Sequence, residues 1–524
     1  MKSKRLILLG GFVLLAIGIF SCLPEFGPDR RAQRKVEETR RSLRQVGFKL
    51  DLSEFAGTIS PEIRNRSALL VRAGEASPGI PIDRFFLAQG IESAHAIWKE
   101  PQLKRVDPFA SSIALASPSD SSRSNGVATQ PAEDLWLEFR SQFAQKELLD
   151  QACEAAIAGP IQFALQFDTP TNVHLNHLAG IRQLSRTLAG RVVMDLHDQR
   201  MAGARKNLLA TTRLSTAWRP EPAEISHLVR ANCLANAYNA TWELLQAHGW
   251  NDEQLAQLQH EWESLDLWKD LPETASFSRA STTAACRLER HASLSAMGFG
   301  QLLQPLFYGL AQGPVSAVED FANSFSYNRR QSTYLKRGTY EDENVLMLHY
   351  RDREDLWKKA ITAPTWEIMR GLGVATNELP ASSRFPSQTS VTINLRQNSN
   401  GLFGGSGGLG GMRRSFSTRI ADAEARRTIL IAALALSRFE LKNGSYPSSL
   451  AELTPEFCQK PLIDFMDGKP LRYHAEGGHA LLYSVGPDCV DDGGKSTLRE
   501  RFTAQRPNAT IANSDVIWPR AASH

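Results

Sequence analysis

Hydrophobic residues recur every three or four positions along much of the middle of the chain. One such series is Leu178, Ile181, Leu184, Leu188, Val192 and Leu196. This spacing places the side chains on one face of a helix. The same pattern predicts helices over residues 202–214 and 223–248. A further helix is predicted after Asn251, because Gln254 follows it at the spacing of a capping box.

Successive amphipathic helices joined by short turns must bury their apolar stripes against each other. We therefore expect an array of helical hairpins in a domain over residues 133–380. The residues around Glu341, Asp342 and Glu343 read as the solvated start of another helix within it. The tryptophans of this region, Trp242, Trp250, Trp262 and Trp268, are expected to fill the core rather than bind a ligand.

The pattern changes near the C-terminus. A long apolar-faced helix is predicted over residues 420–441, with Asn443-Gly444 as its stop. After it, strand-like residues flank Gly477-Gly478 and predict a hairpin. The fold class is therefore expected to be mainly α. A helical-hairpin array is followed by a small α+β module at 413–524, formed by the long helix and a short antiparallel sheet.

Three other stretches organise the chain. Residues 29–116 read as a helical entry region, in which a highly charged helix leads into the body of the protein. Residues 117–132 are rich in serine and polar residues and predict a flexible loop. Residues 385–412 contain many glycines and predict a linker.

The N-terminus, residues 1–22, resembles an export signal. Basic residues precede an apolar run from Leu6 to Phe20, which is short for a membrane-spanning helix. The run ends in Ile19-Phe20-Ser21-Cys22, which resembles a bacterial lipobox and implies lipidation at Cys22. The alternative is an uncleaved signal anchor. Under both readings the N-terminus is held at a membrane and the bulk of the chain is extracytoplasmic, in a bacterial cell envelope.

Composition narrows the classes of partner and site. The 60 basic and 56 acidic residues nearly balance, so we expect no nucleic-acid partner. Six cysteines without a CxxC pair exclude a disulfide-built scaffold and a zinc finger. Cys458 and Cys489 could form a disulfide after export, or be two separate small apolar residues.

Several motif matches fail on their context. The glycine-rich linker contains the dinucleotide-binding spacing from Gly405 to Gly410 and the nucleophile-elbow spacing around Ser406. Both chemistries need a strand that ends directly in the turn, and a glycine linker does not supply one. No constellation of residues therefore points to a particular reaction, and an enzyme is the less favoured reading.

His174 and His177, with His197 and Asp198 further on, could in principle ligate zinc. The helix predicted between His177 and His197 would separate its ends by about 30 Å, which argues against a shared site. An extracytoplasmic metal-dependent hydrolase with a site in the helical domain is kept as the alternative function.

The C-terminal hundred residues resemble the globular domain of the major pseudopilins of type II secretion. The shared features are the helix ending in Asn443-Gly444-Ser445-Tyr446-Pro447, a Gly-Lys-Pro strand, the string Tyr483-Ser484-Val485-Gly486-Pro487-Asp488, and a trailing Asp515-Val516-Ile517-Trp518. The rest of the chain resembles uncharacterised bacterial envelope proteins that carry such modules.

The resemblance implies a calcium site in the loop after the Tyr-Ser string. Asp488 would be a ligand, with Asp491, Asp492 and Asp515 as partners, and clustered carboxylates on a glycine-containing loop suit this cation. This chain departs from the family because Cys489 stands where a glycine is usual. We therefore expect a membrane-tethered scaffold with a calcium-binding module and protein partners, linked to secretion or envelope assembly.

Overall fold

The computed structural model describes residues 29–77, 137, 139–141, 143, 145–169, 172–247, 249–296, 334–376, 415–476, 479–494 and 515–518. The predicted signal segment at 1–22, including Cys22, lies outside these ranges, as do the loop at 117–132 and the linker at 385–412. The described part is mainly helical and carries a small antiparallel sheet near the C-terminus, as the sequence predicts.

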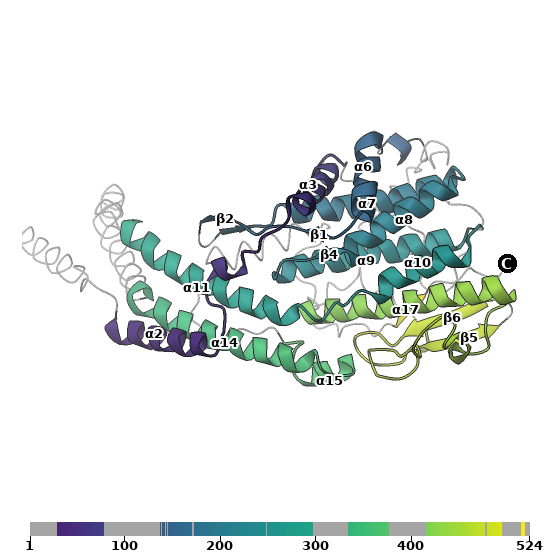
Figure 1. Ribbon diagram of the computed structural model, residues 1–524. Helices are drawn as coiled ribbons and strands as arrows, with labels where there is room; N and C mark the ends of the chain where they lie inside the picture. Colours follow the sequence, from purple (N-terminus) through teal and green to yellow (C-terminus); the bar gives the residue numbers. More distant parts are fainter. Residues whose placement is uncertain are drawn as a thin grey trace, which may run out of the picture.

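Six described helices from α3 to α10 form stacked layers. They are α3 (Pro61–Glu75), α6 (Lys146–Ile157), α7 (His177–His197), α8 (Met201–Thr216), α9 (Glu224–Leu245) and α10 (Asp252–Glu263). Helix α7 contacts α3, α8 and α9, and the layers are visible in Figure 1. The predicted capping box at the start of α10 is confirmed, because the side chains and backbones of Asn251 and Gln254 bond reciprocally. Trp242 and Trp262 are fully buried, which confirms their core role.

Close approach of α3 and α7 depends on two glycines. A Cβ atom added to Gly74 would lie 1.9 Å from the carbonyl oxygen of Gly180. A side chain at either position would have to displace backbone, so hydrogen atoms here set the distance between the two helices.

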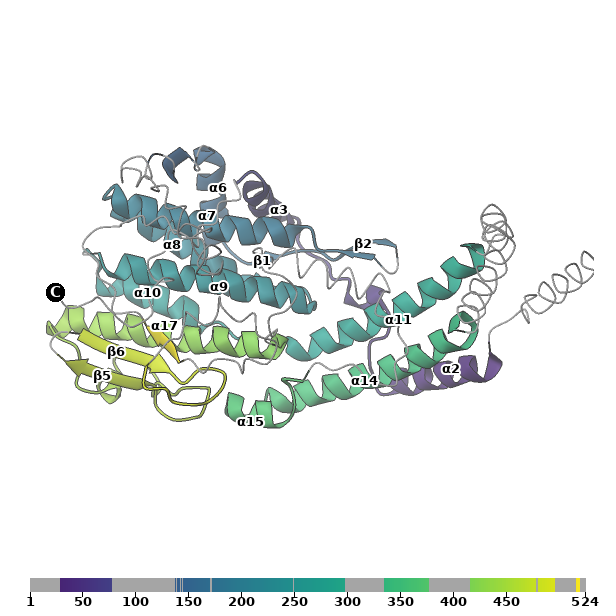
Figure 2. The same cartoon turned by 180° about the vertical axis from the view of Figure 1, so that it is seen from behind.

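A second group of helices extends to one end of the molecule. Helices α11 (Leu271–Ala296) and α14 (Thr339–Ala360) lie side by side, a turn of π-helix, η4 (Tyr334–Gly338), precedes α14, and α2 (Arg30–Gln45) lies along α14. Figure 2 shows this end opposite the C-terminal hairpin. The short elements η1 (Leu52–Phe55) and α15 (Trp366–Gly371) complete the group.

The acidic start of α14 is not the solvated patch that the sequence predicts. Asp342 and Glu343 are 1% and 0% exposed. The Asp342 carboxylate accepts a hydrogen bond from the Tyr334 hydroxyl at 2.8 Å. Glu343 forms ion pairs with Arg40 of α2 and Arg290 of α11. Arginines from two other helices compensate the buried charge, which a reading of local sequence does not detect.

Helix α17 (Phe416–Asn443) is the central element of the C-terminal part. It ends at Gly444, which adopts the predicted left-handed conformation with φ 75°. One side of α17 packs on α9 and α10, and it also contacts the sheet of β5 (Arg472–Glu476), β6 (His479–Ser484) and β7 (Val516–Trp518). The strands are antiparallel in the order β5-β6-β7, with the short η5 (Leu450–Leu453) between α17 and β5.

The helical array and the C-terminal module share one hydrophobic core. The same cluster of buried side chains includes Leu234 of α9, Leu258 of α10, Leu430 of α17 and Leu482 of β6. Hydrogen bonds cross the boundary as well: the Tyr238 hydroxyl of α9 donates to the carbonyl of Ile517 in β7 at 2.7 Å. The module is therefore built onto the array, with α17 as the common element.

Two small strand pairs were not predicted. Strand β1 (Ile161–Gln162) pairs in parallel with β4 (Trp218–Arg219), and β2 (Gln166–Thr169) pairs with β3 (Asn172–His174). Each is too short to show a period-two pattern. Among the described helices, none combines the length and the apolar character that are needed to cross a bilayer.

Candidate metal site in the C-terminal loop

The acidic loop, residues 485–494, follows β6 and lies beside the start of β7, because the backbone N–H groups of Asp492 and Gly494 donate to Asp515. Antiparallel pairing sets Ser484 opposite Val516, so Asp515 lies next to the point where the loop leaves β6. Asp488, Asp491 and Asp492 follow within eight residues of Ser484. The sheet register thus brings together carboxylates that are far apart in sequence.

Helix α15 holds the first half of the loop. The Trp366 indole Nε1 donates to the carbonyl oxygen of Pro487 at 2.8 Å. The Arg370 guanidinium donates to the carbonyl of Asp488 at 2.8 Å. Cys489 has a φ of 63°, a conformation that glycine adopts at little cost.

Asp515 is the most enclosed of the four carboxylates, with 1% of the residue exposed. Its oxygens accept hydrogen bonds from the backbone of Gly494 at 2.7 Å and of Asp492 at 3.3 Å. Burial raises the pKa of Asp515 to about 6, and the charges of Asp491 and Asp492 contribute to the rise. The surroundings of Asp515 therefore disfavour its ionised form.

The carboxylates of Asp492 and Asp488 also lack a compensating positive charge. The Oδ2 atom of Asp492 is buried and has no hydrogen-bond partner in the described part of the chain. Burial raises the pKa of Asp488, and the charge of Asp492 adds to the effect. A buried carboxylate oxygen without a donor is costly unless a cation or proton meets it.

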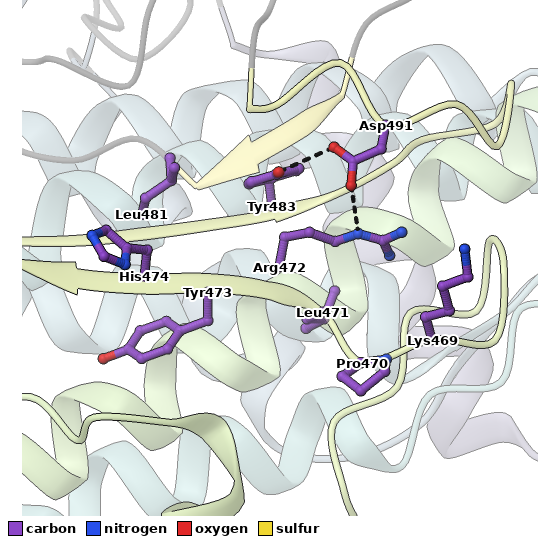
Figure 3. Close-up of a pocket in the computed structure, with 9 residues that line it drawn as sticks. All are labelled: Lys469, Pro470, Leu471, Arg472, Tyr473, His474, Leu481, Tyr483 and Asp491. Carbon is purple, nitrogen blue, oxygen red and sulfur yellow. Dashed lines mark hydrogen bonds and ion pairs between the residues drawn. The ribbon is translucent and has the colours of Figure 1, made fainter.

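The Asp491 carboxylate is hydrogen-bonded to side chains of the sheet. Its oxygens accept from Arg472 Nε and from the Tyr483 hydroxyl, both at 3.1 Å (Figure 3). Although burial opposes ionisation, the hydrogen bonds from Gly493, Arg472 and Tyr483 keep the pKa of Asp491 below its usual value.

Arg472 also pairs with Asp467 at 2.6 Å and Asp464 at 3.3 Å. Arg472 borders an open groove of about 570 Å³ on the outer face of β5 and β6. Arg472, Trp366 and Arg370 could not be recognised as site residues from the sequence, because their partners are distant in sequence or are backbone atoms.

The donor set fits a hard cation only in part. Asp488, Asp492 and Asp515 offer carboxylate oxygens, and the loop supplies backbone carbonyls of the kind that calcium accepts. Within the described ranges, no group of three or more His, Cys, Asp or Glu side chains is already arranged to hold a metal ion. Binding would therefore require these carboxylates to rearrange.

Cys458 and Cys489 are free thiols in the structure, so the predicted bridge is not formed. Cys458 is buried beside Gln259 of α10, whose Nε2 lies 3.9 Å from its sulfur. Cys489 instead directs its sulfur to the carbonyl of Met466 at 3.4 Å. The two thiols occupy different surroundings in the structure.

The histidines considered for zinc lie at the two ends of α7, which begins at His177 and ends at His197. His177 Nε2 is 3.0 Å from the buried Glu221 carboxylate, and its ring stacks on Phe163. Asp198 forms ion pairs with Arg140 and Arg200. Helix length thus separates His177 from the His197 region. A metal-dependent hydrolase stays a prediction, and the described residues include no cluster of His, Cys, Asp or Glu side chains that would hold its metal.

Comparison with known proteins adds no relative. The chain matches no model of a protein family, no curated protein and no solved structure.

Proposed function

We infer that this protein is a membrane-tethered extracytoplasmic scaffold that carries a pseudopilin-like, calcium-binding module at its C-terminus. It would present that module to protein partners in secretion or in assembly of the bacterial cell envelope. The proposal rests on the export-like N-terminus, the pseudopilin motif and the charge arrangement of the acidic loop.

The observation that carries the calcium part is the unpartnered Oδ2 of Asp492. It belongs to the same loop as Asp488 and Asp515, whose pKa values are both raised, first by burial and then by neighbouring carboxylates. A divalent cation would neutralise this repulsion, and calcium tolerates the irregular coordination that a loop offers.

The shared core supports the scaffold part. Because α17 packs on both the helical array and the sheet, the module has a fixed position relative to the array. The Trp366 and Arg370 contacts tie the acidic loop to α15 in addition. A cation bound in the loop would therefore stabilise a junction between segments on either side of residues 377–414.

The test uses the full chain, because a fragment containing only residues 413–524 would expose the face of α17 that α9 and α10 cover. Thermal unfolding is followed with millimolar calcium, with magnesium and with chelator. Ligand present at about 100 times its dissociation constant adds about 2.7 kcal/mol of stability. We expect a rise of a few degrees with calcium and a smaller one with magnesium.

The variants Asp492→Asn and Asp488→Asn should lose the calcium-dependent rise. Asp355→Asn, an exposed acidic residue of α14, is the matched control and should keep it. Identical unfolding curves of the parent chain in calcium and chelator would remove the calcium part of the proposal.

A further inference from the structure

The exposed face of α2 is strongly basic. Its exposed cations are Arg30, Arg31, Arg34, Lys35, Arg41 and Arg44. At about 100° per residue, Arg30, Arg34 and Arg41 fall within a stripe roughly 40° wide. The face opposite this stripe carries Val36 and Leu43, which are buried. The exposed acidic residues of α2 are Glu37 and Glu38, and Glu37 is paired with Arg40, so a positive excess remains.

Five of these cations, all except Arg44, have no internal counterion in the part of the chain that the structure describes. Other arginines of the same helix do: Arg40 pairs with Glu37 and Glu343, and Arg44 pairs with Asp51. Arg40 thus turns toward α14, whereas the five unpaired cations face outward.

The basic face has a fixed direction because α2 is firmly docked. Val36 and Leu43 pack with Met347 of α14 in a small hydrophobic cluster. The Thr39 hydroxyl donates to the side-chain oxygen of Asn344 at 2.6 Å. In both views α2 lies at the end of the molecule opposite the β5–β6 hairpin (Figures 1 and 2).

Chain length places this face near the membrane if the proposed tether holds, and the present inference rests on that function. The apolar run ends at Phe20, ten residues before Arg30. Even a fully extended connection reaches only about 3.5 Å per residue, or roughly 35 Å in all. Anionic lipid headgroups attract basic residues near a membrane surface, and each contributes about fivefold to binding.

We propose that the basic face of α2 binds the anionic phospholipid headgroups of the membrane that holds the N-terminus. The surface consists of Arg30, Arg31, Arg34, Lys35 and Arg41. Contact through this face directs the α2 end of the body toward the bilayer and the acidic C-terminal loop away from it.

The test reconstitutes the full chain with two kinds of vesicle, pure phosphatidylcholine and phosphatidylcholine with about 30% phosphatidylglycerol. Flotation first measures association, and hydrogen exchange then measures protection of the α2 amides. The variant replaces Arg30, Arg34 and Arg41 with glutamine, which preserves helix propensity. The matched control makes the same change at Lys269, Lys359 and Lys460, three exposed cations outside α2.

If both proposals hold, the chain floats with both vesicles. Protection of the first turns of α2 is then several-fold higher on the anionic vesicles, and it is lost in the α2 variant but not in the control. Flotation with anionic vesicles alone, lost in the α2 variant, supports the basic surface and rejects the tether. Equal α2 protection on both vesicles, or no anionic flotation at all, overturns the inference about α2.

Discussion

The indole Nε1 of Trp366 donates a hydrogen bond to the carbonyl oxygen of Pro487 at 2.8 Å. The two residues are 121 positions apart, and the contact fixes the acidic loop onto α15. Both residues are buried, so neither atom can exchange this bond for water.

Trp366→Phe should therefore destabilise the protein. The carbonyl of Pro487 would keep only the longer hydrogen bond from Arg370 at 3.3 Å, so the loss should cost about 1 kcal/mol. The loop would also lose preorganisation, so calcium affinity should fall with stability. Denaturant unfolding and calcium titration measure the two effects. Trp250→Phe removes a similar bond to Leu244 far from the loop and should leave calcium affinity unchanged.

Gly74→Ala should be among the most damaging small substitutions. The added Cβ would lie 1.9 Å from the Gly180 carbonyl oxygen, so α3 and α7 must move apart. Overpacking of this kind costs about 1–3 kcal/mol or more. Gly57→Ala, where no atom lies within 4 Å of the new Cβ, is the control. Equal unfolding free energies for the two variants would contradict the glycine contact.

Glu343→Gln should loosen the docking of α2. Removing the carboxylate charge leaves Arg40 and Arg290 without their shared counterion. Breaking a buried ion pair costs about 3–5 kcal/mol, partly offset here because glutamine keeps the shape. Hydrogen exchange should show faster exchange across α2, whereas Glu341→Gln at an exposed pair with Arg337 should have little effect.

His227 should make stability depend on pH. Burial lowers its pKa to about 3, with a further contribution from the charge of Arg230. Because the unfolded histidine has a pKa near 6.5, the unfolded state binds more protons below that pH. The stability contribution of neutral His227 is thus fully present above pH 6.5 and declines as pH falls toward 3.

At pH 5 the decline attributable to His227 should reach about 2 kcal/mol relative to pH 7. His227→Leu should flatten the dependence of the unfolding free energy on pH in this window. His260→Gln, at an exposed position of α10, should not. A slope that is the same in the parent chain and in His227→Leu would contradict the assignment.

The helices with strong periodicity could be predicted from the sequence. The stretch from Leu178 to Leu196 became α7, and Asn443-Gly444 ended α17, because local spacing and a left-handed glycine determine these features. The register of the sheet also explains why the segment that follows Asp515 lies beside the segment that begins at Tyr483.

Contacts between distant segments could not be predicted in the same way. Asp342 and Glu343 look like a solvated helix start, yet arginines and a tyrosine from elsewhere bury them. The different hydrogen-bond partners of the loop carboxylates could not be predicted either. Asp491 accepts hydrogen bonds from Arg472 and Tyr483, whereas the Oδ2 atom of Asp492 has no hydrogen-bond partner among the described residues. This difference depends on the packing of β5 against the loop.

The most direct test of the calcium-binding module is equilibrium calcium binding to the full chain, measured by calorimetry in chelator-treated buffer. The account predicts one calcium ion per chain, lost in Asp492→Asn and retained in Asp355→Asn. Absence of binding, or binding that Asp492→Asn leaves intact, would contradict it.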